Sequence, residues 1–298
     1  MSEAKEQIVV LGAGGVQGGA VAERLLSEGY AVRTIVRTEA KSQELRERGI
    51  NAIAGDLGQA DSLREVFAGA EKAVVLLPVE FDRNKITVYI NHIVEAAKAA
   101  ELKLLVVNTG LRLSRDESDS EAIELKRELV QAVRLSGIPS VVLEPTLYYE
   151  NFLIPGVLNG DTLAYPVPED RPIAWISIDE TAAYTVEALK RPELAGTHIK
   201  LGGPEALTGK EIAERFSQAL GKDIKFFSLP VPAFEGAIAP LLGDHNAAGL
   251  AGLYSWINTN SEQVAKSGAS VWLDAAPLTL GDWINGIASS NASGWNAT

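Results

Sequence analysis

The chain has 298 residues, of which 46% are hydrophobic and 22% are charged, the balance of a soluble globular protein of one or two domains. Its 39 acidic residues outnumber its 27 basic residues and give a net charge of −12, which argues against nucleic acid as a partner. The absence of cysteine excludes disulfides and thiol catalysis, and with only three histidines we expect no metal site.

The sequence also indicates where the protein resides. No apolar run reaches the roughly 18 residues that a membrane-spanning helix needs. The first residues carry charges and lead directly into a predicted strand, without a leader-type apolar segment. We therefore expect a cytoplasmic protein with no membrane partner.

The first half of the chain alternates predicted strands and helices. Strands are predicted at 7–11, 31–36, 51–54, 72–77, 102–107 and 140–143, and helices at 20–28, 40–48, 62–69, 86–100 and 121–136. The strands are short continuous runs of Val, Ile and Leu, which is typical of parallel strands buried on both faces. This pattern predicts an α/β fold with a Rossmann-type, doubly wound parallel sheet.

The alternation stops after Pro145, which predicts a second, smaller α/β lobe. Helices are expected at 177–190 and 210–221, a strand at 197–201, and a covering layer of apolar helices at 230–254. Asp179 is expected to cap the first of these helices. We predict a nucleotide-binding domain at 1–150, a substrate-binding lobe at 151–290, to which other parts of the chain can contribute, and a flexible tail at 291–298.

Three glycines follow the first predicted strand with the spacing G-x-x-G-x-x-G. Such glycines allow a sharp turn, a close approach of the backbone to a pyrophosphate, and tight packing of the next helix. The start of that helix then offers free N–H groups to the phosphates. This context predicts a dinucleotide site rather than a bare structural turn. Its expected residues are Gly12, Gly14, Gly15, Val16, Gln17 and Gly18.

The end of the second predicted strand indicates which dinucleotide binds. Arg37 and Lys41 can flank a ribose 2′-phosphate, which favours NADP(H) over NAD(H). Glu39 is an acidic residue of the kind that holds a free 2′-hydroxyl, so NAD(H) remains an alternative. A solvated charged loop is the simpler alternative for the whole segment.

Two further strand ends are expected to line the cofactor. Asp56 and Leu57 follow the third strand, where the carboxylate can accept from the adenine amino group and Leu57 can contact the ring. Leu77 and Pro78 end the fourth strand, along which a dinucleotide passes. A simple strand exit explains both segments almost as well.

These segments together resemble the NmrA-like family of atypical short-chain dehydrogenase/reductases. The resemblance rests on GAGGVQGGAV, VRTEAK, AGDL and IELKRELVQAVRLSGIPSVVLEPTLYYENF, and returns at WISIDETAA and GPEALTGKEIAERFSQALGK. Gly14 stands where the family usually has Thr. The chain is also similar to isoflavone-reductase-type enzymes around Lys126. The resemblance implies a Rossmann domain, a small C-terminal substrate lobe and NADP(H) as the cofactor.

The resemblance also implies where chemistry takes place. Ordinary short-chain dehydrogenases use Ser with Tyr-x-x-x-Lys, in which Tyr exchanges the proton and Lys lowers its pKa. Lys126 matches that Lys, Ala122 stands where the Tyr is expected, and Thr109 can replace the Ser. Spacing alone describes Lys126 as a solvated residue of a charged helix, whereas the resemblance implies contact with the nicotinamide end.

A tyrosine-rich segment follows the sixth predicted strand. In the resembled family this segment lies along the nicotinamide, which implies cofactor contacts from Tyr148, Tyr149, Glu150 and Asn151. Tyr149 is then a candidate proton donor beside Lys126 and Thr109. The alternative is that both tyrosines only form the wall of the pocket.

Two functions of different classes follow from these features. The first is an NADP(H)-dependent enzyme that acts on an apolar, aromatic or polycyclic carbonyl, quinone or imine, with a non-redox variant kept because the usual Tyr is absent. The second is an NADP(H)-sensing regulator without turnover that binds a protein partner.

Overall fold

The computed structural model describes residues 6–265 and 277–289, so the predicted tail at 291–298 lies outside the described residues. The chain divides into two compact units that interleave in sequence. Unit 1 contains residues 1–110, 125–144 and 181–199, and unit 2 contains residues 111–124, 145–180 and 200–298.

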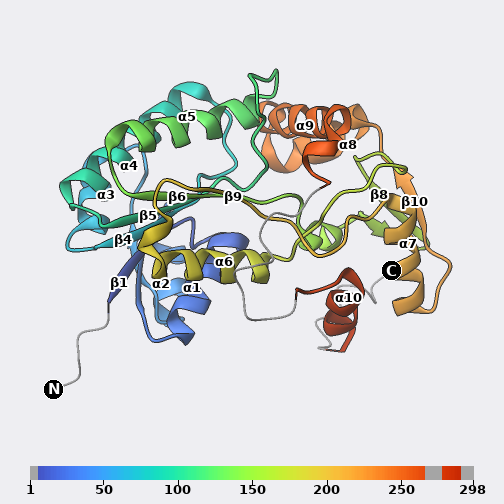
Figure 1. The fold of residues 1–298 in the computed structure, drawn as a ribbon, viewed down its shortest axis with the longest axis horizontal. Helices are drawn as coiled ribbons and strands as arrows, with labels where there is room; N and C mark the ends of the chain where they lie inside the picture. Colours follow the sequence, from blue (N-terminus) through green and yellow to red (C-terminus); the bar gives the residue numbers. More distant parts are fainter. Residues whose placement is uncertain (1–5, 266–276, 290–298) are drawn as a thin grey trace. The chain divides into compact units, whose positions relative to one another are not determined.

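Unit 1 is built on a seven-stranded sheet of order β3-β2-β1-β4-β5-β6-β9 (Figure 1). Its strands are β1 (Gln7–Leu11), β2 (Ala31–Val36), β3 (Asn51–Ala54), β4 (Lys72–Val75), β5 (Leu104–Asn108), β6 (Ser140–Glu144) and β9 (His198–Lys200). Strands β1 to β6 all pair in parallel. The predicted Rossmann-type fold is confirmed, and β9 adds a seventh strand at the edge beside β6.

Helices cover both faces of this sheet (Figure 1). On one face lie α1 (Val16–Ser27), α2 (Glu39–Glu47) and α6 (Ile178–Lys190), and on the other lie α3 (Ala60–Phe67), α4 (Arg83–Ala99) and α5 (Glu121–Ser136). The strands between them are buried, and residues 8–11 and 104–107 have no exposed surface. The order reverses between β1 and β4, and the carboxyl ends of strands on either side of such a reversal form a binding crevice.

Unit 2 combines a small sheet with helices. The sheet has the order β10-β8-β7, with β7 (Leu158–Asn159), β8 (Thr162–Tyr165) and β10 (Lys225–Ser228). The helices are α7 (Gly209–Leu220), α8 (Val231–Leu242), α9 (Asp244–Thr259) and α10 (Leu280–Ser289), with the short turn η1 (Tyr149–Leu153). The apolar segment at 230–254 forms α8 and the first part of α9, which pack against each other, although α8 buries none of its own residues.

Two local expectations need correction. Helix α1 begins at Val16, four residues before the predicted start, because Gly18 and Gly19 are helical and packed rather than part of a loop. The cap before α6 is Ser177, whose hydroxyl accepts from Glu180 N at 3.0 Å while Glu180 Oε2 accepts from Ser177 N at 3.4 Å. Asp179 instead lies in the first turn, where its charge suits the helix dipole.

Candidate functional site: a glycine loop and the strand ends around it

The glycine loop turns sharply where β1 ends. Gly12 has φ +92°, a conformation that favours glycine, and its carbonyl accepts a hydrogen bond from Gly15 N at 2.9 Å. A Cβ on Gly18 would overlap the carbonyl oxygen of Gly12, so the helix approaches the turn only without a side chain there. A Cβ on Gly15 would meet, among the described residues, only that same oxygen at 3.5 Å. The two glycines therefore serve different needs, close packing at Gly18 and open approach at Gly15.

The start of α1 is arranged to receive an anion. Its N-cap is Gly15, which has no side chain to satisfy the first N–H groups, and the first turn contains no acidic residue. Val16, the first helical residue, is 73% exposed; Gly14 and Gly15 precede it, and Gln17 follows it. Uncapped N–H groups at the positive end of a helix form an anion site. This geometry fits the pyrophosphate of a dinucleotide.

The two cations expected at a phosphate after β2 differ in their ion pairs. Glu39, because of which NAD(H) remained an alternative cofactor, forms an ion pair with Arg46 at 2.7 Å. Lys41 forms one with Glu44 at 2.7 Å. Arg37 is exposed, and no ion pair with a described residue engages it. A Cβ on Gly14 would lie 3.8 Å from Lys41 Cε, so the Lys41 side chain runs beside the glycine loop. This arrangement fits a 2′-phosphate at Arg37 better than a 2′-hydroxyl at Glu39.

The segment after β3 is a tight turn around Asp56. Asp56 Oδ1 accepts from Gly58 N at 2.6 Å, and His92 Nδ1 lies 3.2 Å from the carbonyl oxygen of Leu57. Tyr89, one turn before His92 on α4, has its ring edge against Gly58. Neither α4 residue is predicted as a site residue from the sequence, since nothing near them in the chain marks them as neighbours of this turn.

The segment after β4 meets the candidate catalytic lysine. Lys126 Nζ donates to the carbonyl oxygen of Leu77 at 3.4 Å, while Pro78 is exposed. Burial lowers the pKa of Lys126 from 10.5 to about 8. One turn earlier on α5, Ala122 is fully buried and offers no proton. Lys126 is thus an amine with a pKa near neutral pH, and it lies at the carboxyl end of the central strands.

Thr109, the candidate for the usual Ser, follows β5. It is 1% exposed, and its hydroxyl donates to the carbonyl oxygen of Leu143 at 3.0 Å. Within unit 1 the structure therefore brings together the glycine loop, the ends of β2, β3 and β4, and Lys126, and it places Thr109 in a buried hydrogen bond at the end of β5.

In unit 2, the four tyrosine-segment residues expected at the cofactor lie in and before η1. Tyr148 is 4% exposed and forms an isolated parallel β-bridge with Ile176, and Tyr149 has no exposed surface. The Tyr149 hydroxyl donates to the carbonyl oxygen of Leu278 at 3.4 Å, and Asn151 hydrogen-bonds Tyr165. Burial, with Glu180 and Glu205 nearby, raises the pKa of Tyr149. These side chains are engaged inside unit 2, and proton donation by Tyr149 stays a prediction.

Glu150 is the titratable residue of η1. Its two oxygens accept from Ile178 N at 3.0 Å and from Trp283 Nε1 at 3.3 Å. Burial, the dominant cause, raises the pKa of Glu150 from 4.5 to about 7. The two hydrogen bonds lower that pKa only in part, and the neighbouring charge of Asp179 raises it further.

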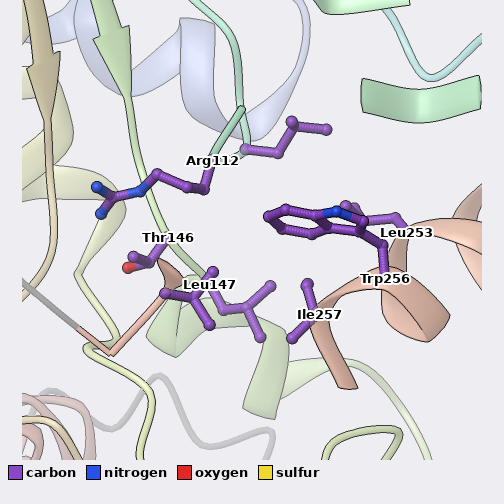
Figure 2. A pocket seen from close by; sticks show the side chains of 8 residues that line it. Arg112, Thr146, Leu147, Leu253, Trp256 and Ile257 are labelled. Atoms are coloured by element: carbon purple, nitrogen blue, oxygen red, sulfur yellow. The ribbon is translucent and has the colours of Figure 1, made fainter. Parts of the chain in front are cut away.

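Unit 2 also contains a small apolar pocket (Figure 2). It is lined by Leu111, Arg112, Thr146, Leu147, Leu253, Trp256, Ile257 and Val264. The indole of Trp256 faces the interior, whereas the guanidinium of Arg112 points away from it and donates to the carbonyl oxygen of Leu201 at 2.9 Å. Arg112 therefore lines the pocket with its aliphatic stem.

Across the described residues, no helix has the length and hydropathy that crossing a membrane requires.

Known proteins share this architecture. The NAD(P)H azoreductase of Xenophilus azovorans is 28% identical over 227 residues, which cover 74% of this chain and 77% of the relative. Triphenylmethane reductase of Citrobacter sp., solved with NADP(H), superposes with a TM-score of 0.80 at 21% identity over 94% of this chain and 99% of that one. An NADPH-dependent quinone oxidoreductase of Escherichia coli, solved with NADPH, gives 0.74 at 23% identity over the same shares.

The two solved structures are too distant in sequence to show more than the fold. The NmrA-like family model, by contrast, matches residues 4–284 of this chain. That match includes the glycine loop, the strand ends, Lys126 and η1. The chain is therefore a member of the NmrA-like family, as its sequence motifs indicate.

Proposed function

We propose that the protein is an NADP(H)-dependent reductase of an apolar, aromatic small molecule with a carbonyl, quinone or imine group. The observation that carries the proposal is Lys126, whose ammonium lies 3.4 Å from the Leu77 carbonyl at the carboxyl end of β4. Unit 1 thereby places an ionisable group of lowered pKa on the sheet edge that also bears the glycine loop.

The cofactor part of the proposal rests on unit 1. The uncapped start of α1 takes the pyrophosphate, Arg37 with Lys41 takes the 2′-phosphate, and the Asp56–Leu57 turn takes the adenine. The relatives support this assignment, since the azoreductase is named for NAD(P)H and two of the similar structures contain NADP(H) or NADPH. When bound, the nicotinamide supplies a hydride to the substrate.

Reduction of a carbonyl, quinone or imine also needs a proton. With Ala122 at the usual Tyr position, we assign that proton to Lys126, directly or through a water, and a lysine with a pKa of about 8 carries it at neutral pH. Thr109 and Tyr149 are the other candidates, but each hydroxyl is buried and donates to a backbone carbonyl of its own unit. The substrate class is supported by the relatives, which are named for the reduction of azo, triphenylmethane and quinone compounds.

Loss of NADPH absorbance tests this function with purified protein and a panel of a quinone, an azo dye and an aromatic aldehyde. Turnover of at least one acceptor, faster with NADPH than with NADH, is expected. Tight NADPH binding without turnover of any acceptor would instead favour the sensing regulator.

A further inference from the structure

Helix α4 supports the turn that follows β3. Tyr89 and His92 are three residues apart and therefore share one face of this helix. His92 Nδ1 lies 3.2 Å from the carbonyl oxygen of Leu57, and a Cβ on Gly58 would lie 3.5 Å from Tyr89 Cε1. The imidazole of His92 and the phenol ring of Tyr89 therefore both lie against this turn.

Tyr89 lies where three strand ends converge. Its surroundings include Arg37 after β2, Asp56 after β3, and Glu80 with Lys85 after β4. Burial, followed by the charges of Asp56 and Glu80, raises the pKa of the phenol, which therefore stays a neutral O–H donor. The side chain is half-buried, so part of the ring remains accessible from this edge of the sheet.

Neighbouring residues are already assigned to ligand groups. Arg37 is the cation expected at the 2′-phosphate, and Asp56 is the acceptor expected at the adenine amino group. Tyr89 interacts electrostatically with both. A ring that lies against Gly58 and close to both charges can contact the adenosine that carries these two groups, since aromatic side chains bind nucleobases through their faces.

We propose that Tyr89 contacts the adenosine 2′-phosphate end of the cofactor with its ring, and that His92 positions the Asp56–Gly58 turn for the same contact. This inference rests on the proposed NADP(H) site. It assigns a role to two α4 residues that the strand-end motifs do not include.

Calorimetric titration with NADP⁺ and with adenosine 2′,5′-bisphosphate tests the proposal without any enzyme assay. Tyr89→Ala is expected to weaken both ligands by the same factor, about tenfold, because the lost contact lies in the part that they share. Tyr89→Phe keeps the ring and is expected to stay within about twofold of the wild type. His92→Ala is expected to weaken both ligands less than Tyr89→Ala does.

Tyr30→Ala is the matched control. Tyr30 is also a half-buried tyrosine of unit 1, but it directly precedes β2 and so lies at the opposite end of that strand from Arg37. It should leave both affinities unchanged. Tyr89→Leu retains apolar bulk, so a folded Leu variant with weakened binding supports the ring contact even if the Ala variant unfolds.

Two results would overturn the inference in distinguishable ways. Wild-type protein that binds both ligands, with a folded Tyr89→Ala or Tyr89→Leu variant of unchanged affinity, removes the role of Tyr89 alone. Wild-type protein that binds neither ligand removes the proposed cofactor site together with this inference.

Discussion

Trp283 Nε1 donates to Glu150 Oε1 at 3.3 Å and so joins helix α10 to η1 within unit 2. Two other carboxylates receive backbone N–H groups from the same C-terminal segment, Glu180 from Leu278 at 3.1 Å and Glu205 from Leu280 at 3.3 Å. The rings of Tyr149 and Trp283 pack with centroids 5.5 Å apart. The start of α10 is therefore held within unit 2 by half-buried carboxylates, of which Glu150 has a pKa raised to about 7.

The raised pKa of Glu150 predicts a pH-dependent stability. Between pH 4.5 and about 7 the folded chain binds more protons at this site than the unfolded chain does, so the free energy of unfolding falls as the pH rises. A shift of this size corresponds to about 3 kcal/mol. Urea unfolding of the wild type and of Glu150→Gln at several pH values in this window should show the slope reduced in the variant. Glu169→Gln, which alters an exposed carboxylate of the same unit, should keep the wild-type slope.

Arg37 is expected to determine the preference for NADP(H). Charge-assisted contacts to a phosphate are worth about 1.5–3 kcal/mol, so Arg37→Ala should weaken NADP(H) by about tenfold or more and barely change NAD(H). Lys41→Ala should have a smaller effect, because Lys41 is shared with Glu44 at 2.7 Å. Calorimetry with both cofactors measures this, and equal losses for NADP(H) and NAD(H) would show that Arg37 does not bind the 2′-phosphate.

The glycine loop predicts two different defects from two substitutions. Gly18→Ala forces a Cβ into the Gly12 carbonyl and should lower the stability of the protein by about 1–3 kcal/mol. Gly15→Val should keep native-like circular dichroism and abolish cofactor binding, because the space beside Gly15 is needed by the phosphates rather than by the protein. A folded Gly15→Val variant with wild-type affinity would place the pyrophosphate elsewhere.

The strands and the glycine loop are predictable because their signals are local. The predicted bounds of β1, β2 and β3 match the structure, since each is a short, mostly apolar segment that ends before a glycine or an arginine. The start of α1 is not predicted, because two consecutive glycines usually disfavour helix, and only the close approach to the Gly12 carbonyl explains why Gly18 is needed there. The short strands β7, β8 and β10 are missed because they follow Pro145, where no strand–helix alternation marks their positions.

Contacts between distant parts of the sequence explain what else is missed at the site. His92 lies 35 positions from Leu57, and Trp283 lies 133 positions from Glu150. Nothing in the composition of α4 or α10 indicates these partners, because a hydrogen bond of this kind depends on how elements pack. The resemblance identifies Lys126, but only the structure provides its lowered pKa and its contact with Leu77.

Lys126 is expected to carry the proton of the proposed reduction, and its pKa sets the pH dependence. For the free enzyme, kcat/KM should fall as the pH rises through about 8, because the ammonium is then lost. Lys126→Met should remove that limb and lower kcat by about a hundredfold or more at saturating NADPH. Its melting temperature at neutral pH should not fall, since burial disfavours the charge that the substitution removes.

Tyr149→Phe tests whether Tyr149 supplies the proton instead, because it removes a buried hydroxyl that donates to the Leu278 carbonyl. It should leave kcat and its pH limb near the wild type if Lys126 supplies the proton, and lower kcat by a similar factor if Tyr149 does. NADPH affinity measured for each variant distinguishes a lost ribose contact from a lost proton donor. Full activity of Lys126→Met at saturating NADPH would exclude the assignment.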